Sequence, residues 1–255
     1  METSADEQTR KQIAQLWNWI EKTPAERMAF FGGAGVSTES GIPDFRSADG
    51  LYRQKYGSTP PEEMISRSYF DAHPQEFFDF YFDRMIAPDA WPNRAHISLA
   101  ELEERDILDS VVTQNIDGLH QAAGSTRVHE LHGSVRRNYC MKCGRSYSLP
   151  GMLRLHEAAQ DGIPRCESCG ATVKPDVVLY EEPLDESVMA AALDSISRAD
   201  LLLVAGTSLV VYPAAGFVNC FKGDHLIIVN RDPTPRDALA DLRIRANIGD
   251  VLQPR

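Results

Sequence analysis

Two closely spaced pairs of cysteines are the feature that most constrains the fold of this chain. The pairs are Cys140-x-x-Cys143 and Cys166-x-x-Cys169, and residues 144–165 separate them. Four thiolates in two short pairs match the ligand set of a tetrahedral zinc ion, which we favour over a reactive redox pair. We therefore expect one structural zinc ion that stabilises a small module. Because sulfur would fill every coordination position, we expect no catalytic role for the metal.

Cysteine usage and the N-terminus also bear on the cellular compartment. The fifth cysteine, Cys220, lies in the apolar run GFVNCF and is expected to be a buried small hydrophobe. Metal-bound thiolates rather than disulfides are typical of a reducing cytosol. The N-terminal METSADEQTR is polar and acidic and lacks the basic and apolar regions of a secretory signal. These features predict a cytoplasmic protein.

Charge and hydropathy argue against two classes of partner. The formal net charge of −11 argues against general nucleic-acid binding, which needs a basic surface. No apolar run approaches the roughly 20 residues needed to cross a membrane. We therefore expect neither nucleic acid nor membrane as a partner. The 255 residues suffice for a large domain with a small module, and a monomer is compatible with the sequence, which leaves the oligomeric state unknown.

Apolar segments of strand length alternate with amphipathic helical segments along the chain. In residues 8–22, Ile13, Leu16, Trp17 and Ile20 recur at helical spacing. Short apolar strands are predicted at 27–31, 107–113, 201–205 and 226–229, and further helices at 94–105 and 213–220. Strands that alternate with helices in this way form a parallel sheet that is covered on both faces.

Two stretches interrupt this alternation. Residues 51–85 are helix-like and rich in aromatic residues, and residues 139–174 contain the paired cysteines but little regular pattern. We interpret both as insertions that form a smaller domain beside the sheet. Because ligands of open α/β sheets bind outside the carboxyl ends of the strands, we expect the site in the cleft between sheet and insertions.

A glycine-rich loop follows the first predicted strand. In the run Gly33-Ala34-Gly35-Val36-Ser37-Thr38, the glycines would let the backbone approach a pyrophosphate at the start of a helix. Threonine stands where the usual dinucleotide fingerprint has its third glycine, and no acidic residue ends a second strand about 20 positions on. The loop alone therefore leaves open a dinucleotide site of another kind or a mere strand-to-helix turn.

Five separated blocks of sequence together resemble the sirtuins of bacterial type, the NAD-dependent protein lysine deacylases. They are GAGVS at 33–37, GIPDFR at 41–46, TQNIDGLH at 113–120, ELHG at 130–133 and GTSLVVYPAA at 206–215. The resemblance covers residues 26–251. It implies an α/β fold in which a Rossmann-like parallel-sheet domain carries a smaller zinc-binding and helical domain. On this basis we predict the Rossmann-like NAD-binding domain at 1–48, 86–136 and 176–255, the helical module at 49–85 and the zinc-binding module at 137–175.

The resemblance also implies the reaction. NAD would serve as co-substrate, and an acyl-lysine of a protein or peptide would enter the cleft from the opposite side. The acyl group would pass to ADP-ribose with release of nicotinamide. His132 would be the general base on the ribose hydroxyls, since an imidazole titrates near neutral pH. Without the other blocks, His132 would be interpreted as a structural histidine in a turn.

The string TQNID supplies the groups expected around nicotinamide. By resemblance, Asp117 would hold the carboxamide and Asn115 would lie near the ribose and its water. Gln114 would bond the ribose hydroxyls, and Ile116 would pack on the nicotinamide ring. Turn chemistry alone explains why Asn and Asp occur here, but it does not explain the whole string.

Further residues are assigned to NAD by the same resemblance. Phe45 would lie against the nicotinamide ring, and the guanidinium of Arg46 would reach the phosphates. Two groups complete the expected NAD site: Ala34 and Thr38 at the diphosphate, and Thr207, Ser208, Asn230 and Val251 at the adenosine half. Thr207 and Ser208 are also compatible with an ordinary helix N-cap.

Substrate peptides of sirtuins add as a strand between the two domains. The matching residues 174–182 would supply Val178 and Tyr180 to the peptide. Tyr180-Glu181-Glu182 stands where many members have Phe-Gly-Glu, so the exact peptide contacts remain open. We expect the extra carboxylate to favour basic residues near the target lysine.

The preferred acyl group is the remaining question. Tyr81 and Arg84 have the Tyr-x-x-Arg spacing of sirtuins that bind succinyl or malonyl groups, but Asp83 could neutralise Arg84. We favour a local ion pair and therefore a deacetylase, with a desuccinylase, demalonylase or longer-chain deacylase as the alternative. Mono-ADP-ribosylation and a non-catalytic NAD-binding module are further alternatives, and the intact His132 and Asn115 argue against both.

Overall fold

The computed structural model of the chain describes residues 4–45, 50–53 and 59–253. Within these residues, six parallel strands form one sheet in the spatial order β3-β2-β1-β7-β8-β9. Numbered by their own order along the chain, they read 3-2-1-4-5-6, the Rossmann order of a doubly wound sheet. The strands are β1 (Met28–Gly32), β2 (Leu108–Thr113), β3 (Val128–Glu130), β7 (Leu201–Ala205), β8 (His225–Val229) and β9 (Leu242–Ile244).

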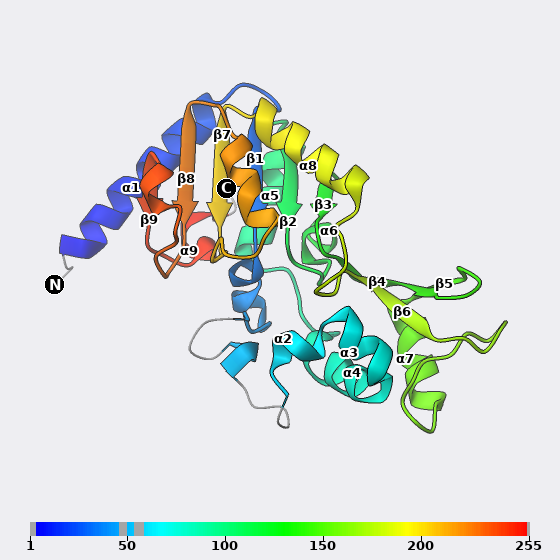
Figure 1. The fold of residues 1–255 in the computed structure, drawn as a ribbon. Helices are drawn as coiled ribbons and strands as arrows, with labels where there is room; N and C mark the ends of the chain where they lie inside the picture. Colours follow the sequence, from blue (N-terminus) through cyan, green and yellow to red (C-terminus); the bar gives the residue numbers. More distant parts are fainter. Residues whose placement is uncertain (1–3, 46–49, 54–58, 254–255) are drawn as a thin grey trace.

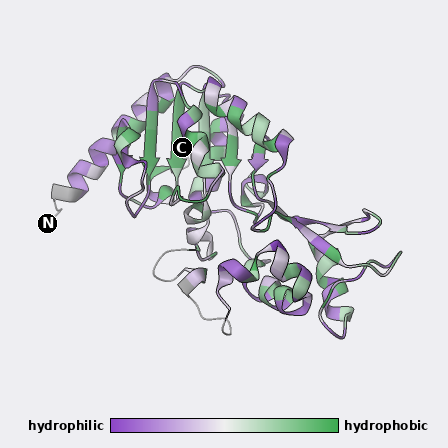
Figure 2. Cartoon of the chain, viewed as in Figure 1, coloured by the Kyte–Doolittle hydropathy of each residue, from purple (hydrophilic) through white to green (hydrophobic). Residues whose placement is uncertain are grey.

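The central strands are apolar throughout because both faces of the sheet are buried. All five residues of β1 and all five of β7 are buried. Successive side chains of a strand point to opposite faces, so Phe30 packs into one apolar core and Phe31 into another. Figure 2 shows the resulting hydrophobic sheet at the centre of the larger part of the molecule.

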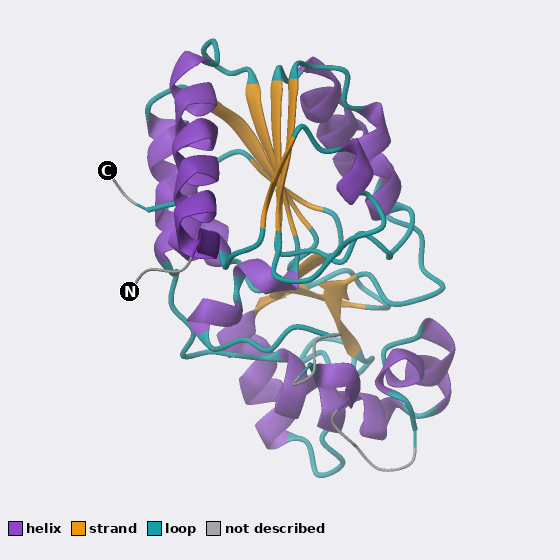
Figure 3. Cartoon of the chain, turned by 90° about the vertical axis from the view of Figure 1, so that its left-hand side faces the viewer, coloured by secondary structure: helices purple, strands orange, loops and turns teal. Residues whose placement is uncertain are grey.

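Helices cover both faces of this sheet, as Figure 3 shows with the sheet edge-on. Leu16 of α1, Leu99 of α5 and Ile248 of α9 pack on the Phe30 face. Ile196 of α8 and Phe217 of the 3₁₀ helix η5 pack on the other face. The elements around the sheet are α1 (Ser4–Lys22), η1 (Ala34–Val36), η2 (Thr38–Ser40), α5 (Arg94–Glu104), α6 (Leu119–Ala122), α8 (Glu186–Arg198), η5 (Ala214–Cys220), η6 (Asp237–Leu239) and α9 (Ile248–Val251).

The smaller part of the molecule lies at the carboxyl edge of the sheet, beyond the ends to which the strand arrows point in Figure 1. Among the described residues, three strands form an antiparallel sheet in the order β5-β4-β6. Phe77, Val135 and Met152 belong to one apolar core that joins this sheet to the helices. The elements are η3 (Leu51–Arg53), α2 (Pro61–Met64), α3 (Arg67–Ala72), α4 (Pro74–Phe80), the π-helical turn η4 (Tyr81–Met85), β4 (Gly133–Cys140), β5 (Ser146–Ser148), α7 (Leu149–Ala158) and β6 (Val173–Val177).

The structure confirms the predicted α/β fold with its parallel sheet and corrects it at the glycine loop. Residues 139–174 show little regular pattern in the sequence, yet β4, β5, β6 and α7 occupy much of this segment. The glycine loop was expected to open a helix, but the short 3₁₀ turns η1 and η2 follow it. Gly41, with φ of 84°, ends η2, and Pro43 follows after Ile42, so the chain cannot continue as an α-helix there.

The domain limits stay a prediction, although the strands bear on them. β4 begins at Gly133 and β6 ends at Val177, so both strands extend beyond the predicted limits of 137–175. A separate finding concerns membranes: across residues 4–45, 50–53 and 59–253, no helix combines the length and the apolar character needed to span a bilayer.

Candidate active-site cleft and zinc site

A cavity of about 670 Å³ opens at the carboxyl edge of the parallel sheet, between the sheet and the smaller part. This volume lies within the range of small-molecule and cofactor sites. The loops that follow β1, β2, β7 and β8 contribute to its wall, as do residues of the smaller part. The residues assigned to NAD from the sequence that line it are Ala34, Phe45, Gln114, Asn115, Ile116, Asp117, His132, Thr207, Ser208 and Asn230.

Two of the described residues assigned to NAD, Thr38 and Val251, are not part of this wall. The hydroxyl of Thr38 donates to the carbonyl of Gly35 at 3.0 Å, so this side chain fixes the loop itself. Val251 is buried in the core, and its carbonyl accepts a hydrogen bond from the indole of Trp17. Arg46 lies outside the described residues. Ala246, Asn247 and Ile248 line the cavity in the region where Val251 was expected.

The glycine loop crosses the loop after β7 with backbone against backbone. Gly35 N donates to Gly206 O at 2.8 Å, and a Cβ on Gly35 would lie 2.8 Å from Gly206 Cα. A Cβ on Gly206 would lie 2.5 Å from the backbone nitrogen of Val36. Side chains at Gly35 and Gly206 would therefore force the two loops apart. β1 and β7 are neighbours where the strand order reverses, which is where doubly wound sheets bind dinucleotides.

Ser37, Asn115 and Asp117 form one hydrogen-bonded cluster at the end of β2. Ser37 Oγ donates to Asp117 Oδ2 at 2.7 Å and accepts from Asn115 Nδ2 at 3.0 Å. Asp117 Oδ1 accepts from the backbone N–H of Leu119 at 2.9 Å, so both carboxylate oxygens have fixed partners. Ser37 belongs to the GAGVS block, but the sequence alone assigned it no role. The signal that could have identified it is a hydroxyl side chain in a cofactor-binding loop.

His132 lies between β3 and β4 and faces the same cavity. Its Nδ1 is 3.0 Å from the carbonyl oxygen of Gln114. Because a carbonyl only accepts, the neutral ring carries its hydrogen on Nδ1, and Nε2 is left as an acceptor. Burial lowers the pKa of His132 below 6.5, and the Gln114 hydrogen bond opposes this only in part. The imidazole is therefore neutral at pH 7 and can take up a proton at Nε2.

Gln114 links the ends of two strands in the cavity wall. Its side-chain amide donates to Thr207 Oγ1 at 3.0 Å, which joins the end of β2 to the loop after β7. Its backbone carbonyl holds His132 at the same time. The structure thus brings Gln114, Thr207 and His132 together, as the sequence predicted for residues of one site.

The residues proposed for the acyl and peptide sites are only partly brought together. Val178, Tyr180 and Arg84 line the cavity. Tyr81 does not, because its side chain is fully buried in the aromatic core and burial raises the pKa of its hydroxyl. Arg84 Nε lies 2.7 Å from Asp83 Oδ2, which is the local ion pair favoured from the sequence. Tyr81 and Arg84 therefore do not face the cavity together.

The four paired cysteines converge at one point of the smaller part. Their sulfur atoms all lie within 4.8 Å of one another, with Cys140 and Cys169 at 3.4 Å and Cys143 and Cys166 at 3.6 Å. A tetrahedral zinc ion with Zn–S bonds of about 2.3 Å places its sulfurs roughly 3.8 Å apart, so the donor set fits one structural zinc. This agrees with the sequence-based prediction.

Each cysteine pair is closed by a glycine turn. Gly144 N donates to Cys140 O at 3.0 Å, and Gly170 N donates to Cys166 O at 2.8 Å. Both glycines have positive φ values, 71° and 73°, which a side chain would strain. The two turns therefore direct the four sulfur atoms toward one another without a bound metal.

Comparisons with known proteins agree with this geometry. A sequence model described as the Sir2 family matches residues 33–213, more than half of the chain. NAD-dependent protein deacetylases of Clostridium acetobutylicum and Clostridium perfringens are 54% and 55% identical over 239 and 230 residues. These matches cover 92% and 89% of this chain and 96% and 92% of the relatives.

Solved structures are similar over nearly the whole chain. A complex of Sir2 with a p53 peptide and NAD⁺ is 36% identical, with a TM-score of 0.81, over 93% of this chain and 94% of that one. A complex of a Sir2 variant with deacetylated p53 peptide and 3′-O-acetyl ADP ribose is 35% identical over the same shares, with a TM-score of 0.86. With the family model and curated relatives matching so much of its length, the chain belongs to the Sir2 family.

Proposed function

We propose that the protein is an NAD-dependent protein-lysine deacetylase. Acyl-lysine, NAD and water would give lysine, nicotinamide and O-acyl-ADP-ribose. The observation that carries this proposal is that the free acceptor of His132 and the Ser37–Asn115–Asp117 cluster belong to the wall of one cavity. The Clostridium relatives, which bear the name NAD-dependent protein deacetylase, support it.

The nicotinamide end of NAD would lie at the Ser37–Asn115–Asp117 cluster. When bound, NAD supplies an electrophilic ribose carbon and nicotinamide as the leaving group. Asp117, held by Ser37 and by the Leu119 N–H, would accept from the carboxamide N–H of nicotinamide. Asn115 would orient polar groups near the ribose, and Ile116 and Phe45 would exclude water from the ring.

The adenosine end of NAD would extend over the neighbouring strand ends. Thr207 and Ser208 follow β7 and Asn230 follows β8, and all three line the cavity. Ala34 would place backbone amide groups near the diphosphate. The base would be His132, which takes a ribose hydroxyl proton at Nε2 while Nδ1 stays bonded to Gln114.

The acyl-lysine would enter from the side of the smaller part, with its peptide along Val178 and Tyr180. Support for a neutral acyl group comes from Tyr81, which is buried away from the cavity, and from the Arg84–Asp83 ion pair. An acyl carboxylate would therefore lack the Tyr and Arg partners expected from the sequence. An Arg84→Ala variant should leave acetyl-lysine turnover within about twofold of wild type, and a selective loss on succinyl-lysine would favour the desuccinylase alternative.

Nicotinamide release with and without an acetyl-lysine peptide tests the proposal. Release that depends on the peptide, with one O-acetyl-ADP-ribose formed per nicotinamide, is the expected result. Release accompanied by labelling of protein would favour mono-ADP-ribosylation. Binding of NAD without any release would favour a non-catalytic module.

We further propose a cytoplasmic location. Support comes from the closely placed cysteine sulfurs, whose thiolate chemistry suits a reducing compartment. Fractionation of cells that express the full chain tests this, and recovery in a membrane or secreted fraction would contradict it.

A further inference from the structure

We propose that Glu181 is a positioning residue for the acyl-peptide substrate, because it ties residues 177–182, here called the 177–182 loop, to helix α3. The inference rests on the proposed function, in which this loop receives the peptide. It concerns a contact away from the reacting groups. Glu181 bonds to Ser68, whereas the Ser37–Asn115–Asp117 cluster and His132 have other partners.

The first observation is the backbone of the loop. Glu181 has a φ of 76°, in the left-handed region that glycine adopts freely and a glutamate adopts at a cost. A side chain at this position therefore strains the loop, and its contacts have to offset that strain.

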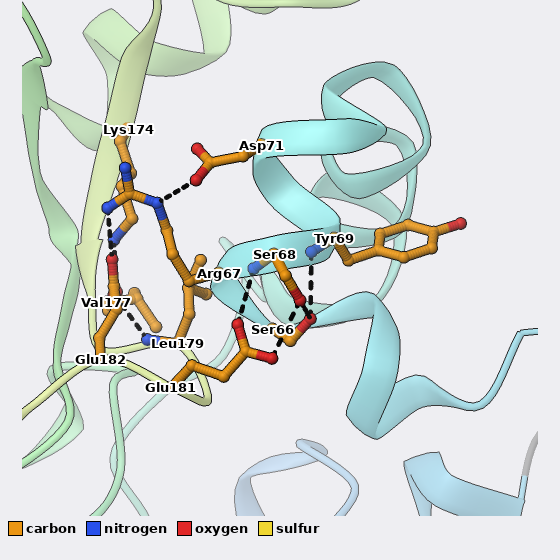
Figure 4. Close-up of polar contacts among 10 residues, drawn as sticks. All are labelled: Ser66, Arg67, Ser68, Tyr69, Asp71, Lys174, Val177, Leu179, Glu181 and Glu182. Carbon is orange, nitrogen blue, oxygen red and sulfur yellow. Dashed lines mark hydrogen bonds and ion pairs between the residues drawn. The ribbon is translucent and has the colours of Figure 1, made fainter.

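The second observation is that the Glu181 carboxylate is fully engaged by α3. One oxygen accepts from the backbone N–H of Ser68 and the other from the Ser68 hydroxyl, each at 2.9 Å. Figure 4 shows Glu181 directed to the first turn of α3, next to Ser66, which caps the N–H of Tyr69. The carboxylate thus connects the loop to the helical module.

The neighbouring carboxylate is engaged as well, by a different set of partners. Glu182 accepts from Lys174 Nζ at 3.0 Å, from Arg67 at 3.1 Å and from the backbone N–H of Leu179 at 2.9 Å. Both carboxylates therefore have partners within the chain, and these contacts order the loop. The expectation that the extra carboxylate favours basic residues of the peptide stays a prediction.

The third observation is the backbone pairing at Tyr180, which the Glu181 contact reinforces. Tyr180 N donates to Ile65 O at 3.1 Å, and Arg67 N donates to Tyr180 O at 3.0 Å. On its other side the loop is held by Val178 N, which donates to His132 O at 3.0 Å. The loop therefore spans from the base to α3, and Val178 and Tyr180 line the cavity between them.

The consequence concerns peptide binding rather than chemistry. A loop that is already ordered loses less conformational freedom when a peptide strand pairs with it, so the bonds to Ser68 should strengthen peptide binding. Without them the loop would need to be ordered by the peptide itself. The Michaelis constant for peptide should rise, while the turnover number and the Michaelis constant for NAD should not change.

The test compares Glu181→Gly, Glu181→Gln and Ser68→Ala with Glu62→Gln, which changes an exposed glutamate of α2. The Michaelis constant for an acetyl-lysine peptide should rise about three- to tenfold in Glu181→Gly, with kcat unchanged. It should rise less in Ser68→Ala, which keeps the backbone N–H bond to Glu181. Glu181→Gln keeps one acceptor and should lie between Glu181→Gly and wild type. The double variant Glu181→Gly with Ser68→Ala should be no worse than Glu181→Gly alone, since Glu181→Gly already removes the hydroxyl bond that Ser68→Ala removes.

Two peptides that carry Arg or Glu beside the acetyl-lysine separate positioning from direct recognition. Positioning predicts the same rise for both peptides in Glu181→Gly, whereas a rise for the Arg peptide alone would overturn the proposal. An unchanged Michaelis constant in Glu181→Gly would also overturn it. Absence of peptide-dependent nicotinamide release from the wild-type protein would instead contradict the proposed function. Hydrogen exchange of the 177–182 loop gives an independent readout: the proposal requires faster exchange in Glu181→Gly and Ser68→Ala than in wild type.

Discussion

His132 donates from Nδ1 to the backbone carbonyl of Gln114 across 3.0 Å, at the point where β2 ends. Gln114 Nε2 in turn donates to Thr207, so the orientation of the base is set from the sheet. This arrangement fixes the tautomer of His132 without a second titratable group. Its proton-accepting capacity is therefore governed by burial rather than by a charged partner.

Replacing the base should remove the reaction without unfolding the protein. We expect His132→Ala to lower kcat for deacetylation by about 10²- to 10⁴-fold, because the ribose hydroxyl loses its proton acceptor. Steady-state assays of nicotinamide release would measure this, with the melting temperature as the check on folding. The control is His73→Ala, which changes an exposed histidine at the start of α4. A His132→Ala enzyme with more than a tenth of wild-type kcat would contradict the assignment.

The acidity of His132 should appear in the pH profile of the reaction. Its folded-state pKa is lowered from 6.5 by burial, and only the neutral ring can act as base. The rate should therefore be constant from neutral pH down to about 6.5 and fall only at lower pH. Measurement of kcat between pH 5 and 8 would show this. An acid limb centred above pH 6.5 would be inconsistent with the buried, neutral imidazole.

Two buried histidines behind the site should make the protein sensitive to acid. His96 and His120 pack ring against ring, and burial lowers the pKa of both, to about 4 for His96 although the Asp117 charge opposes the shift. The unfolded chain binds these protons below about pH 6.5 while the folded chain does not. Stability is thus complete above 6.5 and is lost as the pH falls toward 4, by on the order of 3 kcal/mol for His96 alone.

Denaturant unfolding at pH 7.5 and 5 measures this loss, and one variant tests its origin. The ring nitrogens of His120 have no hydrogen-bond partner among the described residues, so His120→Phe removes a titrating group without breaking a hydrogen bond. The variant should lose less stability than wild type between the two pH values. An exposed His73→Phe control should behave as wild type does. Equal pH dependence in all three proteins would argue against the buried pair as the cause.

Removal of zinc should unfold the smaller part before it affects the sheet. Metal binding and folding are coupled in thiolate sites, so the binding free energy of zinc adds to the free energy of unfolding of the β5-β4-β6 sheet. We expect about one zinc ion per chain by elemental analysis and a lower melting temperature with chelator or in Cys143→Ser. Cys220→Ser, which changes a cysteine outside the cluster, is the control. Full zinc content in Cys143→Ser would exclude the four-sulfur site.

The sequence predicted the four central strands of the sheet, because long apolar runs are local signals, but it did not predict the short edge strands β3 and β9. The NAD residues were assigned by resemblance, and most of them line the cavity. Apolar strands such as 201–205 can be identified from the sequence, and the residues that follow them meet at one edge of a parallel sheet. The role of Ser37 could not be identified, since it depends on Asp117, which follows another strand. The Tyr81–Arg84 spacing was correct as a pattern, but only packing shows that Tyr81 points into the aromatic core.

Strands β4 and β5 of the cysteine-rich segment were not predicted, for a related reason. Buried and exposed residues alternate only weakly along them, so hydrophobic periodicity gives no clear signal. The metal ligands supply part of the order there, and their contribution is not visible in a pattern of apolar residues. The glycine loop shows the opposite case: its composition was noticed, but the partner that requires the glycines, Gly206, became apparent only in three dimensions.

The crossing of Gly35 and Gly206 has a consequence for how this enzyme could diverge. At the crossing the spacing between the two halves of the sheet is set by main-chain atoms, which are the same in any sequence that keeps both glycines. Natural variants that keep both glycines therefore have no side chain at this crossing that could change the affinity for the dinucleotide. Changes in cofactor affinity would have to arise elsewhere in the cavity, for example at Ala246 and Asn247, where side chains line it.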